Sequence, residues 1–298
     1  MAKLTREQFE SLLTSPNVVD EFNALTKEQL TEMLNADVAN MVGFEQKNCH
    51  HCYNLYMHTL KAVESITDKG LTPEQFTQLR VAAFFHDVAK PKVSSFNPKT
   101  KQQVFYGHAE KSVEVATPIL VSLGYSEEEI KRLSFLIGHH DDFISYRTEL
   151  KPFEFNHLFI RKICAETIAE KMIENAYDFN AMGYTEEEIK GILFCLTQNK
   201  KPFFKTKTGN YEFNVDINEV KAKMASGQFT KPFIPTLSDY YLLVQICKAD
   251  SLSQSDFAIQ DGKVVGSKKE KMERNELIES LLGNAYEIFN TLNYSKIK

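Results

Sequence analysis

The chain has 298 residues, of which 43% are hydrophobic and 11% aromatic, so it can bury a sizeable core without disulfide staples. Its net charge of −5 argues against non-specific binding to nucleic acid or to anionic membranes. The N-terminus has charges every few residues, and no apolar run approaches the ~20 residues of a membrane helix. We therefore expect a cytoplasmic protein with no membrane partner.

Helical periodicity dominates the sequence from its start. Helices are predicted at residues 5–15 and, behind a threonine N-cap, at 26–41, and "LYMHTLKAVESI" (55–66) has an apolar helical face. The next helix starts at Thr72, and we expect it to end at Lys90, because the residue before a proline is pushed out of the α region. Residues 91–107 then read as a loop.

The second half continues the same pattern. We expect the remaining helices at 108–123, 126–138, about 156–175, 184–199, 236–252 and 269–292. An Asp-Gly turn between short apolar pairs predicts one small hairpin within 257–267. The sequence therefore indicates an all-α fold with little or no sheet.

One stretch of the chain echoes another. "GYSEEEIKRLSFLIGHH" (124–140) and "GYTEEEIKGILFCLTQN" (183–199) share a Ser/Thr cap and a run of glutamates that suits a helix N-terminus. The first copy ends in His139-His140 and the second in Gln198-Asn199. Two helices with the same good cap explain the shared part, so any chemistry belongs to the first copy.

The strongest chemical signal is "RVAAFFHDVAKPK" (80–92), where His86-Asp87 follows a run that belongs inside a protein. An ionised aspartate there is costly unless it is paired or bound to a metal. Taken alone, a hydrogen-bonded His-Asp couple at a helix end explains it equally well. Further ionisable side chains on or beside other predicted helices favour a metal, because histidine and carboxylate ligands suit divalent transition ions. These residues are His58, His108, His139, His140 and Asp250.

The order of these residues resembles the H…HD…D signature of the HD-domain metal-dependent phosphohydrolases. "HDVAK" is similar to the family's HD-x-G-K, with Ala89 where glycine is usual. "GHAEKS" (107–112), "IGHHDD" (137–142) and "KADSLSQS" (248–255) resemble the later elements. "EQKNCHHCYNLYMHTLKAV" (45–63) resembles the start of the HD domain fused to bacterial tRNA nucleotidyltransferases and poly(A)-polymerase-like proteins.

The resemblance implies an HD-domain helical bundle with an N-terminal extension and a C-terminal covering helix. The expected domains are a helical extension over 1–44, an HD domain over 45–257 and a C-terminal hairpin and helix over 258–298. The HD domain would hold an unassigned helical insert at about 150–235.

The resemblance also implies a ligand set. One divalent ion would be held by His58, His86, Asp87 and Asp250. Asp87 would bridge to a second ion held by His108 and by His139 and/or His140. The number of ions, one or two, stays open, as does their identity among Mn, Ni, Co, Mg, Fe and Zn.

The implied activity is hydrolysis of a phosphoester by metal-activated water. The expected partner is a small phosphorylated, nucleotide-like substrate, with nucleic acid possible only as a substrate end. Asp87 and Lys90 are the candidate catalytic residues, and Lys90, His51 and Arg147 the candidate substrate-binding residues. Lys90 could instead be a solvated lysine at a helix C-terminus. His51 could equally have a structural role, and Arg147 could be an ordinary surface charge.

Two other functions stay open at this point. A few HD-fold enzymes are di-iron oxygenases that bind iron through the same residues, although Lys90 favours phosphate over dioxygen. A binding module stabilised by a purely structural metal is the other alternative. "CHHC" (49–52) predicts neither a zinc site nor a redox site, because no second cysteine pair and no strand–helix context accompany it.

Overall fold

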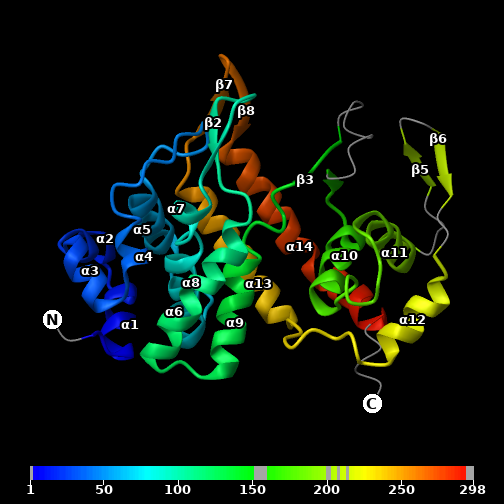
Figure 1. The fold of residues 1–298 in the computed structure, drawn as a ribbon, viewed down its shortest axis with the longest axis horizontal. Coiled ribbons are helices and arrows are strands. Elements are labelled where there is room, and N and C mark those ends of the chain that lie inside the picture. Colours follow the sequence, from blue (N-terminus) through cyan, green and yellow to red (C-terminus); the bar gives the residue numbers. More distant parts are fainter. Residues whose placement is uncertain (1–2, 151–159, 199–202, 207–208, 213–214, 293–298) are drawn as a thin grey trace. The chain divides into compact units, whose positions relative to one another are not determined.

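The computed structural model describes residues 3–150, 160–198, 203–206, 209–212 and 215–292 (Figure 1). These residues are mainly helical, and their strands form only isolated pairs, which confirms the predicted all-α class. None of the helices in these ranges combines the length and the apolar character that a membrane crossing requires.

The chain divides into two compact units, of which the first comprises residues 1–141 and 242–275. Its helices before the first strand pair are α1 (Arg6–Thr14), α2 (Val18–Asn23), α3 (Lys27–Met33), α4 (Ala36–Ala39), α5 (Leu55–Ser65), α6 (Pro73–Phe85) and α7 (Lys90–Val93). The elements that follow are β1 (Ser95–Asn97), β2 (Gln102–Val104), α8 (His108–Leu123), α9 (Glu127–Gly138), β7 (Phe257–Gln260) and β8 (Lys263–Ser267). Two helices, α13 (Leu237–Leu252) and α14 (Lys268–Leu292), contribute to both units.

Helix α6 lies at the centre of the first unit and contacts α1, α5, α8 and α9. Its side chains from Gln78 to Phe85 are all buried. Phe84 and Phe85 join Phe9 of α1 and Phe22 of α2 in one aromatic cluster, with ring centroids 5.0 to 5.8 Å apart. This helix therefore delivers the residues that follow it into the interior of the unit.

Local capping fixes where several of these helices start. Thr5, Thr26, Thr72 and Ser126 each accept a hydrogen bond from the amide three residues later, and the Gln or Glu side chain at that position returns to the cap's own amide. Each pair satisfies two amides that a helix N-terminus would otherwise leave unpaired. Helix starts were therefore predictable from the sequence.

The second unit comprises residues 142–241 and 276–298. Its elements, apart from its parts of α13 and α14, are β3 (Tyr146–Arg147), β4 (Arg161–Lys162), α10 (Ala165–Ala176), α11 (Glu186–Gln198), β5 (Phe203–Thr206), β6 (Gly209–Glu212) and α12 (Ile217–Ala225). Strands β3 and β4 are parallel, whereas β5 and β6 form an antiparallel pair. Helices α10 and α11 pack against each other, and α11 contacts α12.

The hairpin predicted within 257–267 is confirmed as β7–β8. Its two-residue loop is Asp261-Gly262, with φ angles of 50° and 74°, the positive values that a tight hairpin turn requires. A second hairpin, β1–β2, was not expected, because residues 91–107 read as a loop. It pairs Ser95 with Val104 and Asn97 with Gln102.

The structure corrects the predicted helix over residues 72–90. Helix α6 ends at Phe85, and His86 and Asp87 lie in irregular turns closed by bonds from Val88 N to Phe85 O and from Lys90 N to Asp87 O. The Ala83 carbonyl, which a continued helix would offer to the amide of Asp87, lies 2.7 Å from Nδ1 of His86. Competition by this ring for the helical acceptor is a physical reason for the early end.

Other predicted boundaries also shift. The region 26–41 is split into α3 and α4 because Asn35 caps a new helix, and α2 and α12 were not expected. The expected helix at about 156–175 corresponds to α10, and residues 151–159 lie outside the described part of the chain. Residues 1–44 belong to the same compact unit as the site helices, and the limits 1–44, 45–257 and 258–298 stay predictions as domains.

Candidate metal centre

Four side chains from three parts of the first unit meet around one point. His58 comes from α5, His86 and Asp87 from the turn after α6, and Asp250 from α13. Nε2 of His58 lies 3.2 Å from Oδ2 of Asp87 and 3.1 Å from Oδ1 of Asp250. Nε2 of His86 lies 3.1 Å from the same Asp87 oxygen and 3.7 Å from the same Asp250 oxygen. We call this group of four residues the first cluster.

A second cluster uses the other oxygen of Asp87. Oδ1 of Asp87 lies 3.1 Å from Nε2 of His108, at the start of α8, and 3.6 Å from Nε2 of His140, just after α9. The two histidine nitrogens are 3.1 Å apart. One carboxylate therefore belongs to both clusters, with one oxygen facing each.

The histidines are oriented by their own backbone surroundings. Nδ1 of His86, His108 and His140 lies 2.7 to 2.9 Å from the carbonyl oxygen three residues earlier in each case. Nδ1 of His58 lies 3.2 Å from the carbonyl oxygen and 3.0 Å from Oγ of Ser253. A neutral imidazole that donates through Nδ1 presents a lone pair at Nε2, which is the arrangement of a metal ligand.

Local packing brings the second pair of histidines together. Gly107 precedes His108 with a φ of 72°, a left-handed conformation that suits glycine. Gly138 precedes the His139-His140 pair, and a Cβ there would lie 3.2 Å from the side chain of Val113 on α8. A side chain at position 138 would therefore require Val113 to shift by a few tenths of an ångström.

The centre is deeply buried, and its charged groups shift one another's pKa values. His58, His86 and Asp87 are at most 1% exposed. Burial alone would raise the pKa of Asp87, but His86 and Lys90 favour the carboxylate and hold its pKa well below the usual range. Burial would likewise lower the pKa of His86, yet Asp87 and Asp250 together raise it to about 10, so a cation that bound Nε2 would displace a proton from this ring.

These residues fit a divalent transition ion. The buried atoms that lack a hydrogen bond of ordinary geometry include Nε2 of His58, Nε2 of His86 and both carboxylate oxygens of Asp87. Such unsatisfied buried atoms are costly unless something binds them. Imidazole and carboxylate donors are also the ligands that Mn, Fe, Co, Ni and Zn accept. The first cluster could hold one ion, and the second cluster, through Asp87, a neighbouring ion.

Asp141 also lies against the second cluster. Its Oδ2 lies 3.2 Å from Nε2 of His108, and its Oδ1 lies 3.8 Å from Nε2 of His140. It therefore lies at the metal-facing nitrogens, where a ligand would be. The doubled aspartate in "IGHHDD" was the available signal, but the sequence does not distinguish Asp141 from Asp142. Asp142 instead accepts a hydrogen bond from Asn175 within the second unit.

Lys90 points into the centre, and not into solvent. It is 5% exposed, and its ammonium lies 2.6 Å from Oδ2 of Asp87 and 3.0 Å from Oε1 of Gln46. The same ammonium lies 5.2 Å from the centroid of the Phe105 ring. These two contacts use two of the three ammonium protons, which leaves the third for a further acceptor.

His51 lies beside the first cluster. Its ring centroid is 4.8 Å from that of His58, and its buried Nδ1 has no hydrogen-bond partner. Burial is the main cause that lowers the pKa of His51 well below the usual range, so the ring is neutral at pH 7. A neutral imidazole with a free nitrogen can donate to or accept from a bound substrate.

Two expected site residues lie outside both clusters. His139 is the C-cap of α9, and its ring stacks on Phe135 at 4.9 Å, so the structure places His140 and not His139 in the centre. Arg147 belongs to the second unit, is exposed, and donates to the carbonyl oxygens of Ile144 and Tyr146. Its assignment to the substrate stays a prediction.

The surroundings of Asp250 were not identified from the sequence. Gln254, one helical turn later, donates to Oδ2 of Asp250 at 2.7 Å, and Lys271 of α14 donates to Oε1 of Gln254. These two hydrogen bonds hold Oδ2 of Asp250 in place and leave Oδ1 directed at His58 and His86. Partners of this kind orient metal ligands and tune their basicity.

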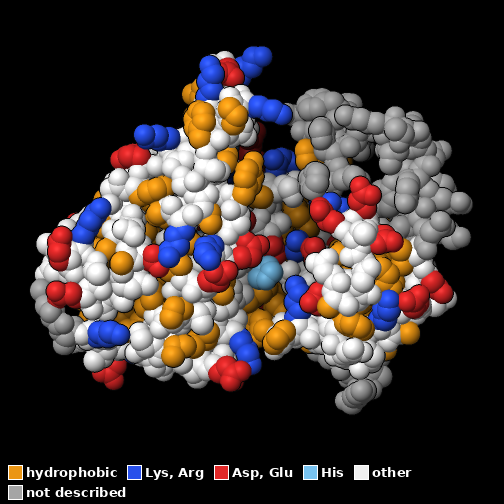
Figure 2. Space-filling model, viewed as in Figure 1, with side chains coloured by type: hydrophobic (Ala, Val, Ile, Leu, Met, Phe, Trp, Pro, Cys, Tyr) orange, Lys and Arg blue, Asp and Glu red, His pale blue; other side chains and the backbone are white. Residues whose placement is uncertain are grey.

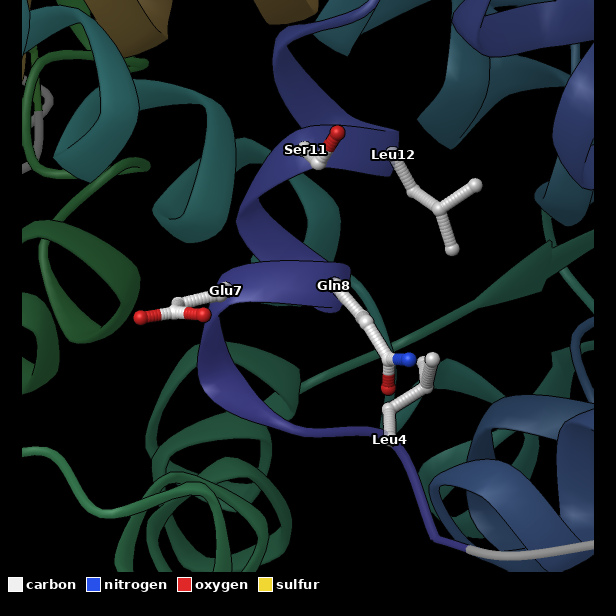
Figure 3. Close-up of a pocket in the computed structure, with 5 residues that line it drawn as sticks. All are labelled: Leu4, Glu7, Gln8, Ser11 and Leu12. Atoms are coloured by element: carbon white, nitrogen blue, oxygen red, sulfur yellow. The ribbon is translucent and has the colours of Figure 1, made fainter.

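The hollow drawn in Figure 3 is not part of this centre. It is lined by Leu4, Glu7, Gln8, Ser11 and Leu12. All five come from α1 and the segment leading into it, so no second element closes the hollow. The residues around it include no member of either cluster, and we assign it no role.

Comparison with known proteins agrees with this arrangement. Residues 49–175 match the family model of the HD domain. A CC-adding tRNA nucleotidyltransferase of Thermus thermophilus is 34% identical over 137 residues, 46% of this chain and 31% of that protein. An A-adding tRNA nucleotidyltransferase of Deinococcus radiodurans is 27% identical over 158 residues, 49% of this chain and 36% of that protein. The chain therefore matches about a third of the length of each relative.

These matches confirm the resemblance that the sequence predicted. Five residues of the two clusters lie inside the range that matches the family model, namely His58, His86, Asp87, His108 and His140. Asp250 lies beyond that range and reaches the first cluster from α13. The centre is therefore completed by a residue that the family match does not include.

Proposed function

We propose that this chain, which carries an HD domain, is a metal-dependent phosphohydrolase for a small nucleotide-like substrate. The bond hydrolysed would be a phosphomonoester or a 2′,3′-cyclic phosphodiester. The observation that supports this proposal most directly is a carboxylate shared by two histidine clusters with a buried ammonium on it, at 2.6 Å. Such a site can bind two cations and the phosphoryl oxygens between them.

Each cluster would hold one ion. His58, His86, Asp87 and Asp250 are the ligands proposed for the first ion, and Asp87, His108, His140 and Asp141 for the second. Bound divalent ions would lower the pKa of a coordinated water and neutralise charge on a phosphoryl group. The open side of the centre is at Asp141 and Asp250, whose side chains are 36% and 17% exposed.

Lys90 would bind the phosphoryl group and stabilise its negative charge. Its ammonium is held in place by Asp87 and Gln46, so little reorganisation is needed when the substrate arrives. His51 would contact the substrate through its unpartnered Nδ1. Asp87 would position the two ions relative to each other, because each of its oxygens faces one cluster.

The position of Lys90 also favours phosphoester hydrolysis over the two alternatives. A di-iron oxygenase does not need a buried ammonium on the bridging carboxylate, whereas a phosphoryl group carries charge that the ammonium neutralises. A purely structural metal site needs no second cluster beside the first. The structure supplies both the second cluster and the ammonium.

The proposal is tested by a substrate panel on the full chain. Phosphomonoesters, cyclic nucleotides and nucleoside polyphosphates are assayed for phosphate release with Mn²⁺, Ni²⁺, Co²⁺ and Mg²⁺. Metal content and dioxygen uptake are measured on the same preparation. We expect turnover of a nucleotide monoester or a 2′,3′-cyclic nucleotide that disappears in Asp87→Asn.

The matched control is Asp68→Asn, which changes an exposed aspartate outside both clusters. It should keep the metal content and turnover of the parent protein. Iron-dependent dioxygen uptake without phosphate release would replace the proposal with the oxygenase. No turnover of any substrate, together with unchanged metal content in Asp87→Asn, would replace it with the binding module.

A further inference from the structure

The loop that leads to His58 and two hairpin segments bonded to it form one part of the surface of the first unit. We call them the rim: residues 45–53, 95–106 (with β1 and β2) and 256–268 (with β7 and β8). The amides of Lys47 and Cys49 donate to the side chains of Gln103 and Gln102, at 2.8 and 3.3 Å. The amide of Ser255, which leads into β7, donates to the carbonyl oxygen of His50 at 2.9 Å. These bonds hold both hairpins to the 45–53 loop (Figure 1, labels β2, β7 and β8).

The rim concentrates the exposed aromatic side chains of the described residues. Tyr53, Phe96, Tyr106 and Phe257 are 41%, 66%, 76% and 60% exposed, and among the residues whose side chains are described the one other exposed Phe or Tyr is Tyr241. Ile259 and Val264 face each other across β7–β8 and are 56% and 62% exposed. Side chains of this kind are usually buried, so their exposure on three segments that are hydrogen-bonded together favours a binding surface.

The charge of the rim is opposite to that of the whole protein. The rim contains five lysines against three carboxylates, a net charge of +2, whereas the chain as a whole carries −5. Lys47, Lys99, Lys101 and Lys263 are exposed, and the fifth, Lys268, pairs with Asp256 at 3.0 Å. Figure 2 shows basic and hydrophobic side chains together at the top of the view, where Figure 1 labels β7 and β8. The surface therefore suits an anionic partner that also has flat apolar groups.

Each rim segment continues directly into the metal centre. Residues 45–53 carry Gln46 and His51 and lead into α5 with His58. Strand β2 leads through Phe105 and Tyr106 to His108. Residues 256–268 follow Asp250 and Ser253, and Ser253 contacts His58. A ligand lying along the rim would therefore have one end at the clusters.

We infer that the rim binds a single-stranded polynucleotide and directs its phosphorylated end to the metal centre. Bases would stack on Tyr53, Phe96, Tyr106 and Phe257, and backbone phosphates would lie near Lys47, Lys99, Lys101 and Lys263. Alternating stacking and charge of this kind is how proteins bind single strands without reading their sequence. This inference rests on the proposed phosphohydrolase activity and narrows its substrate to the end of a chain of nucleotides.

Other occupants fit the rim less well. A mononucleotide would engage the residues at the clusters and leave the exposed aromatics on the far parts of the hairpins without a role. A second protein or a second copy of this chain would be expected to cover an apolar core from which lysines are excluded, since charged residues are depleted there. In the rim, Lys99, Lys101 and Lys263 lie in the same short hairpins as the aromatic side chains.

The test is binding of a fluorescent single-stranded RNA of about ten nucleotides, with a terminal phosphate, to the full chain. A DNA of the same sequence is the second arm, and the corresponding mononucleotide is the competitor. We expect binding that weakens with salt and is at least about tenfold weaker in Tyr106→Ala or Phe96→Ala. Lys99→Gln/Lys101→Gln should reduce the slope of log affinity against log salt by about 1.4.

The matched control is Tyr241→Ala, which removes the exposed tyrosine that lies outside the rim. It should leave binding of the RNA unchanged. The proposed hydrolysis is followed in parallel as kcat/KM for the RNA and for the mononucleotide, and the rim variants should lower the ratio of the two values. Equal affinities for the RNA and the DNA would indicate that the rim binds any single strand, whereas a higher affinity for one of them would identify which polynucleotide is bound.

Two results would overturn the inference while leaving the proposed function intact. The first is turnover of the mononucleotide with RNA bound no more tightly than the mononucleotide. The second is a concentration-dependent dimer that the rim variants dissociate, since the rim would then be an interface between copies. Conversely, the parent protein could bind RNA and hydrolyse no phosphoester, while the rim variants lose RNA binding. That result would support the rim as an RNA-binding surface and reject the phosphohydrolase activity.

Discussion

The helix pairs α8–α9 and α10–α11 share one local design and differ in what they hold. A glycine with φ of 87° or 92° precedes Tyr125 in the first pair and Tyr184 in the second. Each tyrosine is followed by a Ser or Thr cap whose acidic partner three residues later completes the helix start. A cation also covers each ring: Arg6 lies 4.1 Å from the Tyr125 centroid, and Lys223 lies 4.6 Å from that of Tyr184.

The difference lies at the other end of the second helix. Helix α9 is followed by His140, which joins Asp87, whereas α11 ends with Gln198 after Thr197, which donates to Glu170 at 3.3 Å. Each pair thus contains or contacts one buried carboxylate. Several nitrogens surround Asp87 and its pKa is lowered, but burial dominates for Glu170 and raises its pKa to about 7.

Burial alone therefore does not decide whether a carboxylate is ionised. Asp87 stays ionised because cationic and imidazole groups approach both of its oxygens. Among the described residues, Glu170 is paired with Arg161, at 3.6 Å, and accepts from a threonine, and burial raises its pKa to about 7, so its neutral form is favoured below that pH. The same helix start therefore occurs beside a candidate metal centre in one unit and beside a buried carboxyl with a raised pKa in the other.

Removing one carboxylate from each pair should give the largest contrast. Asp87→Asn should weaken divalent metal binding by about a hundredfold or more, because it removes the ligand shared by both clusters, and activity should fall with it. Glu170→Gln should bind metal as the parent does. Titration calorimetry with Mn²⁺ measures both. Equal losses of metal binding in the two variants would contradict the assignment of Asp87 as the shared ligand.

Lys90→Met tests whether the ammonium acts on the substrate or only balances Asp87. We expect kcat/KM for a phosphoester to fall on the order of a hundredfold to a thousandfold with metal content retained. Lys92→Met is the matched control, because Lys92 is exposed and pairs with Asp37 at 3.0 Å, outside the clusters. A variant that lost metal and activity together would show that Lys90 serves the fold of the site.

Glu170 should make the stability of the second unit depend on pH. Its pKa of about 7 in the fold exceeds the ordinary 4.5, so the folded state binds more protons than the unfolded state between these values. The free energy of unfolding should therefore fall by about 3 kcal/mol as the pH rises through this window.

Urea unfolding at pH 5 and pH 8 measures this fall, and Glu170→Gln should remove most of it. Glu186→Gln, on the exposed first turn of α11, should not. A parent protein with the same stability at both pH values would contradict the assignment of a protonated Glu170.

The shared caps should give the smallest and most equal effects. Ser126→Ala and Thr185→Ala each remove a side chain that accepts from a helix amide, at 3.3 Å in both cases, and each should cost about 1 kcal/mol of stability. Neither should change kcat/KM once the protein is folded. A loss of activity confined to Ser126→Ala would show that the start of α9 also positions His140.

The sequence was informative wherever structure depends on near neighbours. Thr72 and Pro73 start α6, Asp261-Gly262 turns β7 into β8, and the run before His86-Asp87 is buried, as predicted. It was less informative where distant groups compete for the same atoms. The end of α6 at Phe85 depends on a side chain that takes the Ala83 carbonyl.

By itself the sequence determined the all-α class, the starts of the capped helices α3, α6 and α9, and the kinds of side chain available for a metal centre. These follow from periodicity and from bonds that span three or four residues. Only the tertiary structure decided that His140 and not His139 enters the centre, that Asp141 joins it, and that Lys90 turns inward onto Asp87. Those outcomes depend on where α5, α6, α8, α9 and α13 meet. His58 and Asp250 are far apart in the chain, and no local sequence pattern predicts that they are in contact.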